Sequence, residues 1–191
     1  PVSNMKLASG GTAPVPEMWD AGVPVGLGTD GPASNNSLDM FDTMKMTALV
    51  HKNSRWDPTI MNAQRVLDMA TLDGARCIGR EKDLGSVEVG KQADLVLVDL
   101  RDPNLIPIHR KETVVSDLVY SANGQNVDTT IVDGEPLMVN RRYLKLDQDK
   151  IRKSGHQLRS LSLNDAFSMT ILPLSPCHSF VLFSISIVFE K

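Results

Sequence analysis

One carboxylate in the sequence stands at the end of an apolar stretch, where catalytic groups are often found. Residues 23–29 are almost wholly apolar and lead directly to Asp30, after which Gly31 and Pro32 begin a polar loop. Enzymes built on parallel strands hold their catalytic groups at the carboxyl ends of those strands. A Gly-Thr-Asp-Gly tetrapeptide alone is more often a turn than a ligand site. The apolar stretch before it and the capped helix expected after it favour the site, and we predict that Asp30 is a metal ligand and a proton shuttle.

The four histidines do not supply the other ligands of a metal site. Zinc sites take several nitrogen, sulfur or carboxylate ligands, commonly with two of them closely spaced in the sequence. The histidines fall at an expected helix end, in a loop, in a charged helix and in the C-terminal stretch: His51, His109, His156 and His178. No two have the spacing of a metal pair, so each is predicted to be a surface or structural residue. One carboxylate without nitrogen ligands would hold zinc poorly.

The composition is that of a globular protein and argues against two classes of partner. Of 191 residues, 41% are hydrophobic and 23% are charged, and the formal net charge is −3. No long basic run is present, which argues against nucleic acid. The apolar stretch at residues 180–189 is shorter than the roughly 20 residues of a membrane helix. Cys77 and Cys177 have no partner motif, which is typical of a reducing compartment and predicts a cytoplasmic protein.

The first part of the chain has the order of loops, helices and a strand found in an α/β barrel. A complete (β/α)8 barrel takes roughly 250 residues, so the chain is expected to hold only part of one. The predicted elements are a loop over residues 1–11, a helix over 14–21, a buried strand over 23–28, and helices over 38–51 and 62–78. Ser37 is the expected N-cap of the helix over 38–51. Helical spacing predicts a buried face made of the apolar residues Leu38, Phe41, Met44, Ala48, Ala63, Val66, Leu67 and Ala70. Core filling is predicted for Met44, Met46, Met61 and Met69.

The pattern changes to short strands after residue 84. Strands are predicted over residues 85–90, 93–100, 113–121, 129–132 and 136–139. Asp133 and Gly134 form a type I′ hairpin signal between the last two. Such closely spaced strands after two long helices indicate a separate β-module. A charged helix is expected over residues 148–160, and Ser184 to Val188 have strand character.

Several motifs resemble the amidohydrolase superfamily, and most closely its branch of 5-methylthioadenosine/S-adenosylhomocysteine deaminases, which is related to the chlorohydrolases. They are residues 1–10 (PVSNMKLASG), 13–16 (APVP), 26–31 (GLGTDG), 33–36 (ASNN), 85–96 (GSVEVGKQADLV), 120–124 (YSANG) and 127–134 (VDTTIVDG). The resemblance covers roughly residues 1–150 and does not include the C-terminal stretch.

The resemblance implies the role of Asp30 and the chemistry around it. The matching aspartate ends the eighth barrel strand, ligates one divalent metal ion, expected to be zinc, accepts a proton from the metal-bound water and contacts the purine. The implied reaction is hydrolytic removal of ammonia from an adenine-type nucleoside or thioether. The family's His-x-His pair, its fifth-strand histidine, and its further glutamate and histidine have no match in this sequence. The remaining ligands are therefore expected outside this chain, which alone is expected to be inactive.

The expected fold class is α/β: the C-terminal part of a metal-dependent (β/α)8 TIM barrel followed by strands of a small composite β-sandwich. The barrel part is assigned to residues 1–82 and the sandwich strands to residues 83–146. Residues 147–165 are assigned to the charged helix, and residues 166–191 to an apolar tail unrelated to the family. Unpaired barrel edges favour association, so a homo-oligomer is also expected.

Three alternatives remain open. Another amidohydrolase, acting on guanine or on a triazine, would share the same motifs. A non-catalytic β-sandwich piece with an interaction role is a competitor from a different class, because a fold does not determine a function. A truncated gene product would explain the missing initiator methionine and the unusual tail. In every catalytic reading the partner is a small molecule, with no nucleic acid and no membrane.

Overall fold

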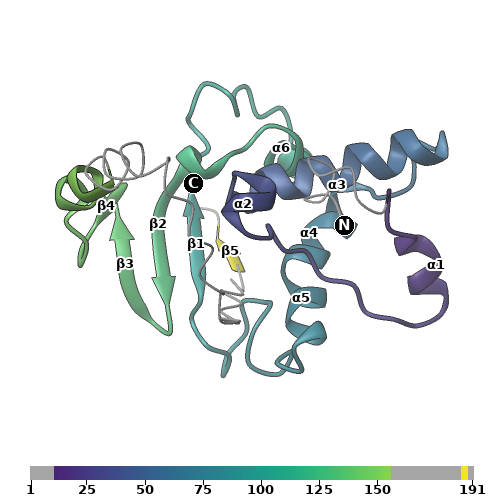
Figure 1. Cartoon of the computed structure of the whole chain (residues 1–191), viewed down its shortest axis with the longest axis horizontal. Helices are drawn as coiled ribbons and strands as arrows, with labels where there is room; N and C mark the ends of the chain where they lie inside the picture. The colour runs from purple at the N-terminus through teal and green to yellow at the C-terminus, as the bar shows by residue number, and fades with distance from the viewer. Residues whose placement is uncertain (1–10, 156–185, 189–191) are drawn as a thin grey trace, which may run out of the picture.

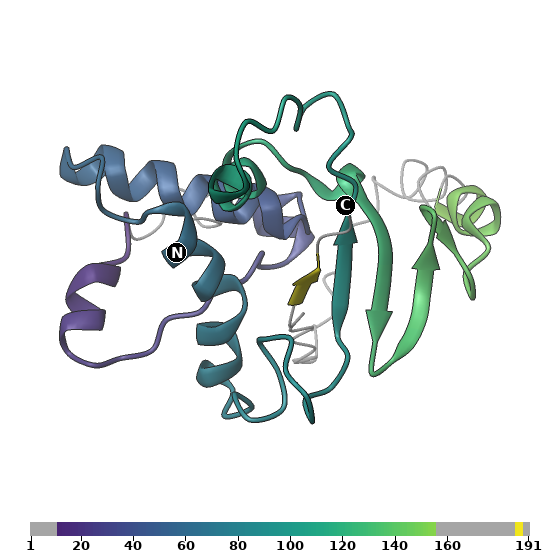
Figure 2. The ribbon, with the colours of Figure 1, turned by 180° about the vertical axis from the view of Figure 1, so that it is seen from behind.

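The computed structural model describes residues 11–155 and 186–188, and in it a group of helices packs beside one sheet (Figure 1). The labelled helices are α1 (Val15–Asp20), α2 (Pro32–Asn35), α3 (Met40–Arg55), α4 (Ala63–Ala70), α5 (Leu72–Cys77) and α6 (Val114–Tyr120), with 3-10 turns η2 (Lys111–Thr113) and η3 (Gly124–Asn126). The strands are β1 (Leu95–Val98), β2 (Val127–Val132), β3 (Glu135–Val139), β4 (Arg142–Tyr143) and β5 (Ser186–Val188). Helix α6 packs on α3 and α4, and the view from behind shows it next to α3 (Figure 2).

The sheet has the strand order β4-β3-β2-β1-β5. Its first four strands are antiparallel neighbours, whereas β5 runs parallel to β1. The strands predicted over residues 93–100, 129–132 and 136–139 are confirmed in β1, β2 and β3. The hairpin signal is confirmed too, because Asp133 (φ 51°) and Gly134 (φ 76°) both have the positive φ that a type I′ turn requires.

Two predicted strands of the β-module are wrong. Residues 85–90 form bends and a turn and no strand, and the side chains of Val87 and Val89 are exposed there. Residues 114–120 form helix α6, which buries Leu118 and Val119 completely. The β-branched composition of this segment favoured a strand, but the spacing of its apolar residues lets a helix bury them together against α3 and α4.

The strand predicted over residues 23–28 is not formed in the structure. This segment is extended, with Val23 exposed and only Leu27 buried. Its connection to the helices includes one backbone hydrogen bond, from the N–H of Leu27 to the carbonyl oxygen of Met69 (3.1 Å). A strand requires a ladder of bonds to a neighbouring strand, and the residues described between 11 and 94 contain no other strand that could supply one.

Helix α3 has the predicted buried face but different ends. Phe41, Met44 and Ala48 are buried, as expected, whereas the side chain of Leu38 is 64% exposed and precedes the helix. The N-cap is Asp39, whose side chain accepts a hydrogen bond from the N–H of Phe41, and not Ser37. The helix continues beyond the predicted end at residue 51 and stops at Arg55.

The helix predicted over residues 62–78 is two helices. It begins as expected behind Asn62, whose side chain caps α4 by accepting from the N–H of Arg65. It breaks at Thr71, where φ is −125° and ψ is −88°. The hydroxyl of Thr71 donates to the carbonyl oxygen of Leu67 (2.8 Å), so the side chain replaces part of the helical hydrogen bonding at the break. Ala63, Val66 and Ala70 are buried as predicted, and Leu67 is partly buried.

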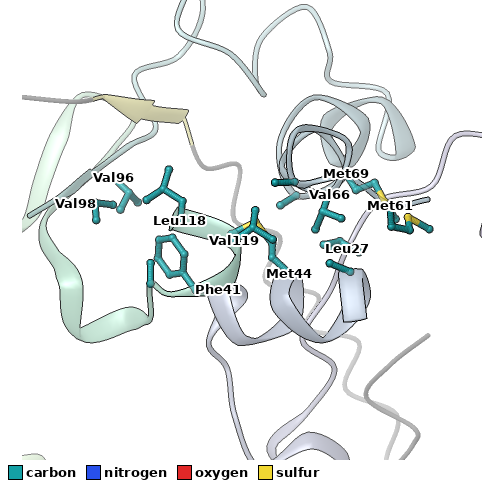
Figure 3. Packing of buried hydrophobic residues seen from close by; sticks show 14 of the residues in the cluster. Leu27, Phe41, Met44, Met61, Val66, Met69, Val96, Val98, Leu118 and Val119 are labelled. Atoms are coloured by element: carbon teal, nitrogen blue, oxygen red, sulfur yellow. The ribbon is translucent and has the colours of Figure 1, made fainter. Parts of the chain in front are cut away.

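The core joins the helices to the sheet (Figure 3). Val96 and Val98 of β1 belong to one cluster with Phe41 of α3 and Leu118 of α6, and the cluster continues to α4. The methionines predicted to fill the core do so in three cases, Met44, Met61 and Met69, while Met46 faces solvent. Side chains from the sheet and from the helices share this core. The β-module therefore packs directly against the helices that lie next to residues 23–39.

Some predictions lie partly or wholly outside the described residues. Of the loop expected at residues 1–11, only residue 11 is described. Of the charged helix expected over 148–160, residues 148–155 are described and are helical. The strand character expected near the C-terminus is confirmed at residues 186–188, which form β5.

Candidate functional site

Asp30 lies on an exposed loop directly after the extended segment. Its φ of 59° is left-handed, a conformation that is uncommon for a residue with a side chain. The Asp30 Oδ1 atom accepts a hydrogen bond from the N–H of Gly31 at 2.7 Å, and the Thr29 hydroxyl donates to the Asp30 carbonyl oxygen at 3.2 Å. The carboxylate therefore sits on a tight, locally bonded turn. Unfavourable backbone conformations of this kind are concentrated at functional sites in proteins.

A second turn behind Asp30 closes the loop. Helix α2 begins after Gly31, and its C-cap is Asn36, which is also left-handed (φ 66°). The side-chain amide nitrogen of Asn35, Nδ2, donates to the carbonyl oxygen of Thr29 (2.8 Å) and to that of Ser37 (2.9 Å). The half-buried side chain of Asn35 thus joins Thr29, the residue before Asp30, to Ser37, which lies two residues before the N-cap of α3.

The segment that leads to Asp30 lies very close to helix α5. A Cβ atom placed on Gly26 would be 2.9 Å from the Cα atom of Gly74 and 3.4 Å from the sulfur of Cys77. Only glycine allows this approach, since non-bonded carbon atoms pack optimally at about 3.5–4.0 Å. Gly26 thereby determines how closely the backbone before Asp30 can approach the helices.

Asp39 connects the loop to the β-module. Its Oδ1 atom caps α3 by accepting from the N–H of Phe41 (2.9 Å), and its Oδ2 atom accepts from the N–H of Gly124 in η3 (2.6 Å). The N–H of Asp39 donates to the Ser37 hydroxyl oxygen (3.1 Å). A single carboxylate therefore links the start of α3 to η3, although Asp39 and Gly124 are 85 residues apart in the sequence.

The described residues do not complete a metal site. Within residues 11–155 and 186–188, no group of three or more His, Cys, Asp or Glu side chains could hold a metal ion. Asp30 thus offers one oxygen donor to a site that the described residues do not complete. No described helix is long and apolar enough to span a membrane.

The histidines behave differently from one another. His109 is exposed in a loop, as predicted, while His156 and His178 lie outside the described residues. His51 is not at a helix end but inside α3, and it is fully buried, with no hydrogen-bond partner for either ring nitrogen among the described residues. Burial lowers the pKa of His51 below its ordinary value, so the neutral ring is favoured.

The sequence indicates a turn after Asp30, but not the contacts that hold this loop. Ser34 to Ser37 are all Ser or Asn, residues that favour turns because their side chains bond to nearby backbone. That composition signalled a turn without showing which carbonyl groups Asn35 would reach.

Comparison with known proteins finds relatives of this chain that are named as deaminases. A family model described as the amidohydrolase family matches residues 1–137. The chain is 52% identical over 151 residues to a 5'-deoxyadenosine deaminase of Methanosarcina acetivorans, and 50% identical over 151 residues to a 5-methylthioadenosine/S-adenosylhomocysteine deaminase of Moorella thermoacetica. Each match covers 79% of this chain and 34% of the relative, so the chain spans about a third of their length.

Solved structures agree with the sequence comparison. A zinc-bound adenosine deaminase from Xanthomonas campestris superposes with a TM-score of 0.79 at 40% identity, over 86% of this chain and 36% of that one. A zinc complex of an atrazine chlorohydrolase from Arthrobacter aurescens superposes with a TM-score of 0.70 at 29% identity, over 82% and 34%. The likeness confirms the fold class expected from the sequence. With a family match that spans most of its residues, the chain belongs to the amidohydrolase family.

Proposed function

We propose that the protein carrying this chain is a metal-dependent hydrolase of carbon–nitrogen bonds other than peptide bonds, and that it deaminates an adenine nucleoside. The substrates proposed are 5-methylthioadenosine, S-adenosylhomocysteine and the related 5′-deoxyadenosine. The observation that carries the proposal is the match over residues 1–137, which contain Asp30, together with relatives about 50% identical that are named as deaminases of these compounds.

Asp30 is proposed to act in catalysis, in substrate binding and as a metal ligand. Deamination adds water to the amine-bearing carbon of the purine and releases ammonia. The Asp30 carboxylate would accept a proton from the attacking water and return it to the departing nitrogen, which leaves the carboxylate unchanged after each turnover. Its exposed position on a bonded turn makes it accessible to a substrate while its backbone is held.

The proposed cofactor is one divalent metal ion, with zinc favoured by the zinc-bound structural neighbours. Such an ion, when bound, lowers the pKa of a coordinated water towards neutral pH. Because the described residues contribute only Asp30, the other ligands would have to come from elsewhere in the active protein. The division of the chain into a barrel part, residues 1–82, and sandwich strands, residues 83–146, is also part of this proposal.

A cytoplasmic location and a homo-oligomeric state are also proposed. The location is supported by Cys77, an exposed free thiol, which fits a reducing compartment. Size-exclusion chromatography with light scattering measures the oligomeric state, and fractionation of cells tests the location.

The experiment starts from the protein as the cell makes it. A tag inserted within the matched region would recover that protein at its natural length for metal analysis and assays of ammonia release. Asp30→Asn is expected to reduce turnover by at least about 100-fold, the usual contribution of a positioned acid or base. Asp20→Asn, at an exposed position of α1, is the charge-matched control. Turnover retained in Asp30→Asn would refute the role of Asp30.

Two other functions are tested in the same preparation. Atrazine is included among the substrates tested because one structural neighbour is an atrazine chlorohydrolase. Guanine tests the other alternative that the sequence left open. Preferred turnover of either compound would replace the adenine nucleoside as substrate. Absence of zinc, of ammonia release from the nucleosides and guanine, and of chloride release from atrazine would favour a non-catalytic interaction module.

A further inference from the structure

We propose that Asn35 is a positioning residue that holds the backbone of Asp30 in its left-handed conformation. The inference deepens the proposed function and rests on it for its consequence in catalysis. Asn35 would act through Asp30, without touching the substrate itself.

The two hydrogen bonds of Asn35 act on the backbone that carries Asp30. The acceptor of the first is the carbonyl oxygen of Thr29, which belongs to the peptide group joining Thr29 to Asp30. Holding this oxygen fixes the orientation of that peptide plane, and therefore restricts φ of Asp30. The acceptor of the second is the carbonyl oxygen of Ser37, so the same amide group fixes both ends of the loop over residues 29–37.

Asp30 needs such support because its φ of 59° is unfavourable for an L-residue. A released loop would relax towards the extended region, which is sterically broader. This rotation would move the carboxylate away from its present direction and break the hydrogen bond between Gly31 N–H and Asp30 Oδ1. Catalytic groups lose effectiveness with displacements of about 1 Å.

The far end of the loop is itself anchored. The Ser37 hydroxyl oxygen accepts from the N–H of Asp39, and Asp39 accepts from the N–H of Gly124 in η3. The two bonds of Asn35 therefore connect the backbone beside Asp30 to a segment that is itself hydrogen-bonded to η3. The side chain of Ser34, on the same short helix, makes a local bond, from its hydroxyl to the carbonyl oxygen of Gly31 (3.1 Å).

These contacts define the variants. Asn35→Asp keeps the shape of the side chain but replaces the donating amide with a carboxylate, which would face two carbonyl oxygens and cannot donate to them when ionised. Asn35→Ala removes the donors without adding charge, and it separates loss of the clamp from charge repulsion. Ser34→Ala is the matched control, because it removes one bond of the same helix and leaves both bonds of Asn35.

The first measurement is amide hydrogen exchange at Gly31 in the full chain, followed by NMR. Both Asn35 variants are expected to accelerate exchange about tenfold, which is the effect of losing the net contribution of one hydrogen bond or more. Ser34→Ala is expected to change it by less than about threefold. If Gly31 exchanges at the unaltered rate in both Asn35 variants, Asn35 does not hold the loop and the proposal is wrong.

The second measurement is kcat and thermal stability of the tagged natural protein. Both Asn35 variants are expected to lower kcat at least about tenfold, while their melting temperatures stay close to that of Ser34→Ala. Faster exchange with an unchanged kcat, or a kcat loss matched by Ser34→Ala, would reduce Asn35 to an ordinary structural residue. If the unaltered protein deaminates no substrate, the proposed function fails separately, and the exchange rates still decide whether Asn35 holds Asp30.

Discussion

The contact between Gly26 and Gly74 offers a direct test of how the Asp30 segment is held. Replacing Gly26 with alanine adds one methyl group that would lie 2.9 Å from the Cα atom of Gly74, in helix α5. The opposing atom belongs to a backbone, so it cannot rotate away as a side chain would. Either the extended segment or the helix must therefore move.

The cost follows from this geometry. Adding a methyl group to a closely packed region usually costs about 1–3 kcal/mol, and the backbone contact places Gly26→Ala near the middle of that range. Alanine also stabilises by about 0.4–1 kcal/mol, since it restricts the unfolded chain. Gly28→Ala carries the same unfolded-state gain, and a Cβ at Gly28 has no atom within 4 Å. We expect the two variants to differ by about 2 kcal/mol, with Gly26→Ala the less stable.

Urea unfolding of the full chain, followed by tryptophan fluorescence, measures this difference. Trp19 is suited as a probe because its ring lies in α1, 4.0 Å from the guanidinium of Arg65 in α4. A thermal scan should show a difference of about 4–8 °C for a chain of this size. Equal stability of Gly26→Ala and Gly28→Ala would show that the close approach does not hold the segment, and the packing argument would then fail.

Two further predictions concern Asp39 and His51. Asp39→Ala should lower the free energy of unfolding in urea by about 1–2 kcal/mol, because it removes the cap of α3 and the acceptor for the Gly124 N–H. The control Asp42→Ala should lower it by about half as much or less. Equal losses would contradict the linking role of Asp39. Burial lowers the pKa of His51 from its ordinary 6.5, so below about pH 6.5 the unfolded chain binds more protons than the folded chain. The contribution of His51 to the free energy of unfolding is therefore complete above about pH 6.5 and is lost as the pH falls below it. Urea midpoints at pH 7.5 and 5.5 should show this loss, at a slope of at most about 1.4 kcal/mol per pH unit, and His51→Leu should reduce the slope; an unchanged slope would contradict it.

The parts of the fold that depend on local spacing could be predicted from the sequence. Phe41, Met44 and Ala48 recur at helical intervals and are buried together in α3. The Asp133-Gly134 turn was predictable because both positions need positive φ, which few residue types adopt readily. These features are determined by neighbours within a few residues.

The errors arose where distant residues decide the structure. The apolar segment 23–28 has the composition of a buried strand, but a strand also needs a partner, and composition does not reveal one. Residues 114–120 have β-branched side chains yet form α6, because a helix buries Leu118 and Val119 against α3 and α4. Tertiary packing outweighed local preference there.

The candidate site likewise has features that the sequence alone suggests and contacts that only the folded structure shows. Asp30 was predicted because a charged residue after an apolar stretch is conspicuous in a sequence, and its role stays a prediction. The contacts of Asn35 with Thr29 and Ser37 depend on the exact path of a turn, which residue types alone do not specify. Likewise, the bond between Asp39 and Gly124 joins positions 85 residues apart.

The left-handed backbone at Asp30 also limits which residues can replace it during evolution or in protein engineering. Asn, Asp and His adopt this conformation several times more often than other residues with side chains, whereas β-branched and bulky residues rarely do. With φ at 59°, a neutral amide or an imidazole could be substituted at position 30 without rebuilding the turn. A bulky or β-branched residue would need a new loop. The position therefore permits changes in charge and donor chemistry while it restricts changes in shape.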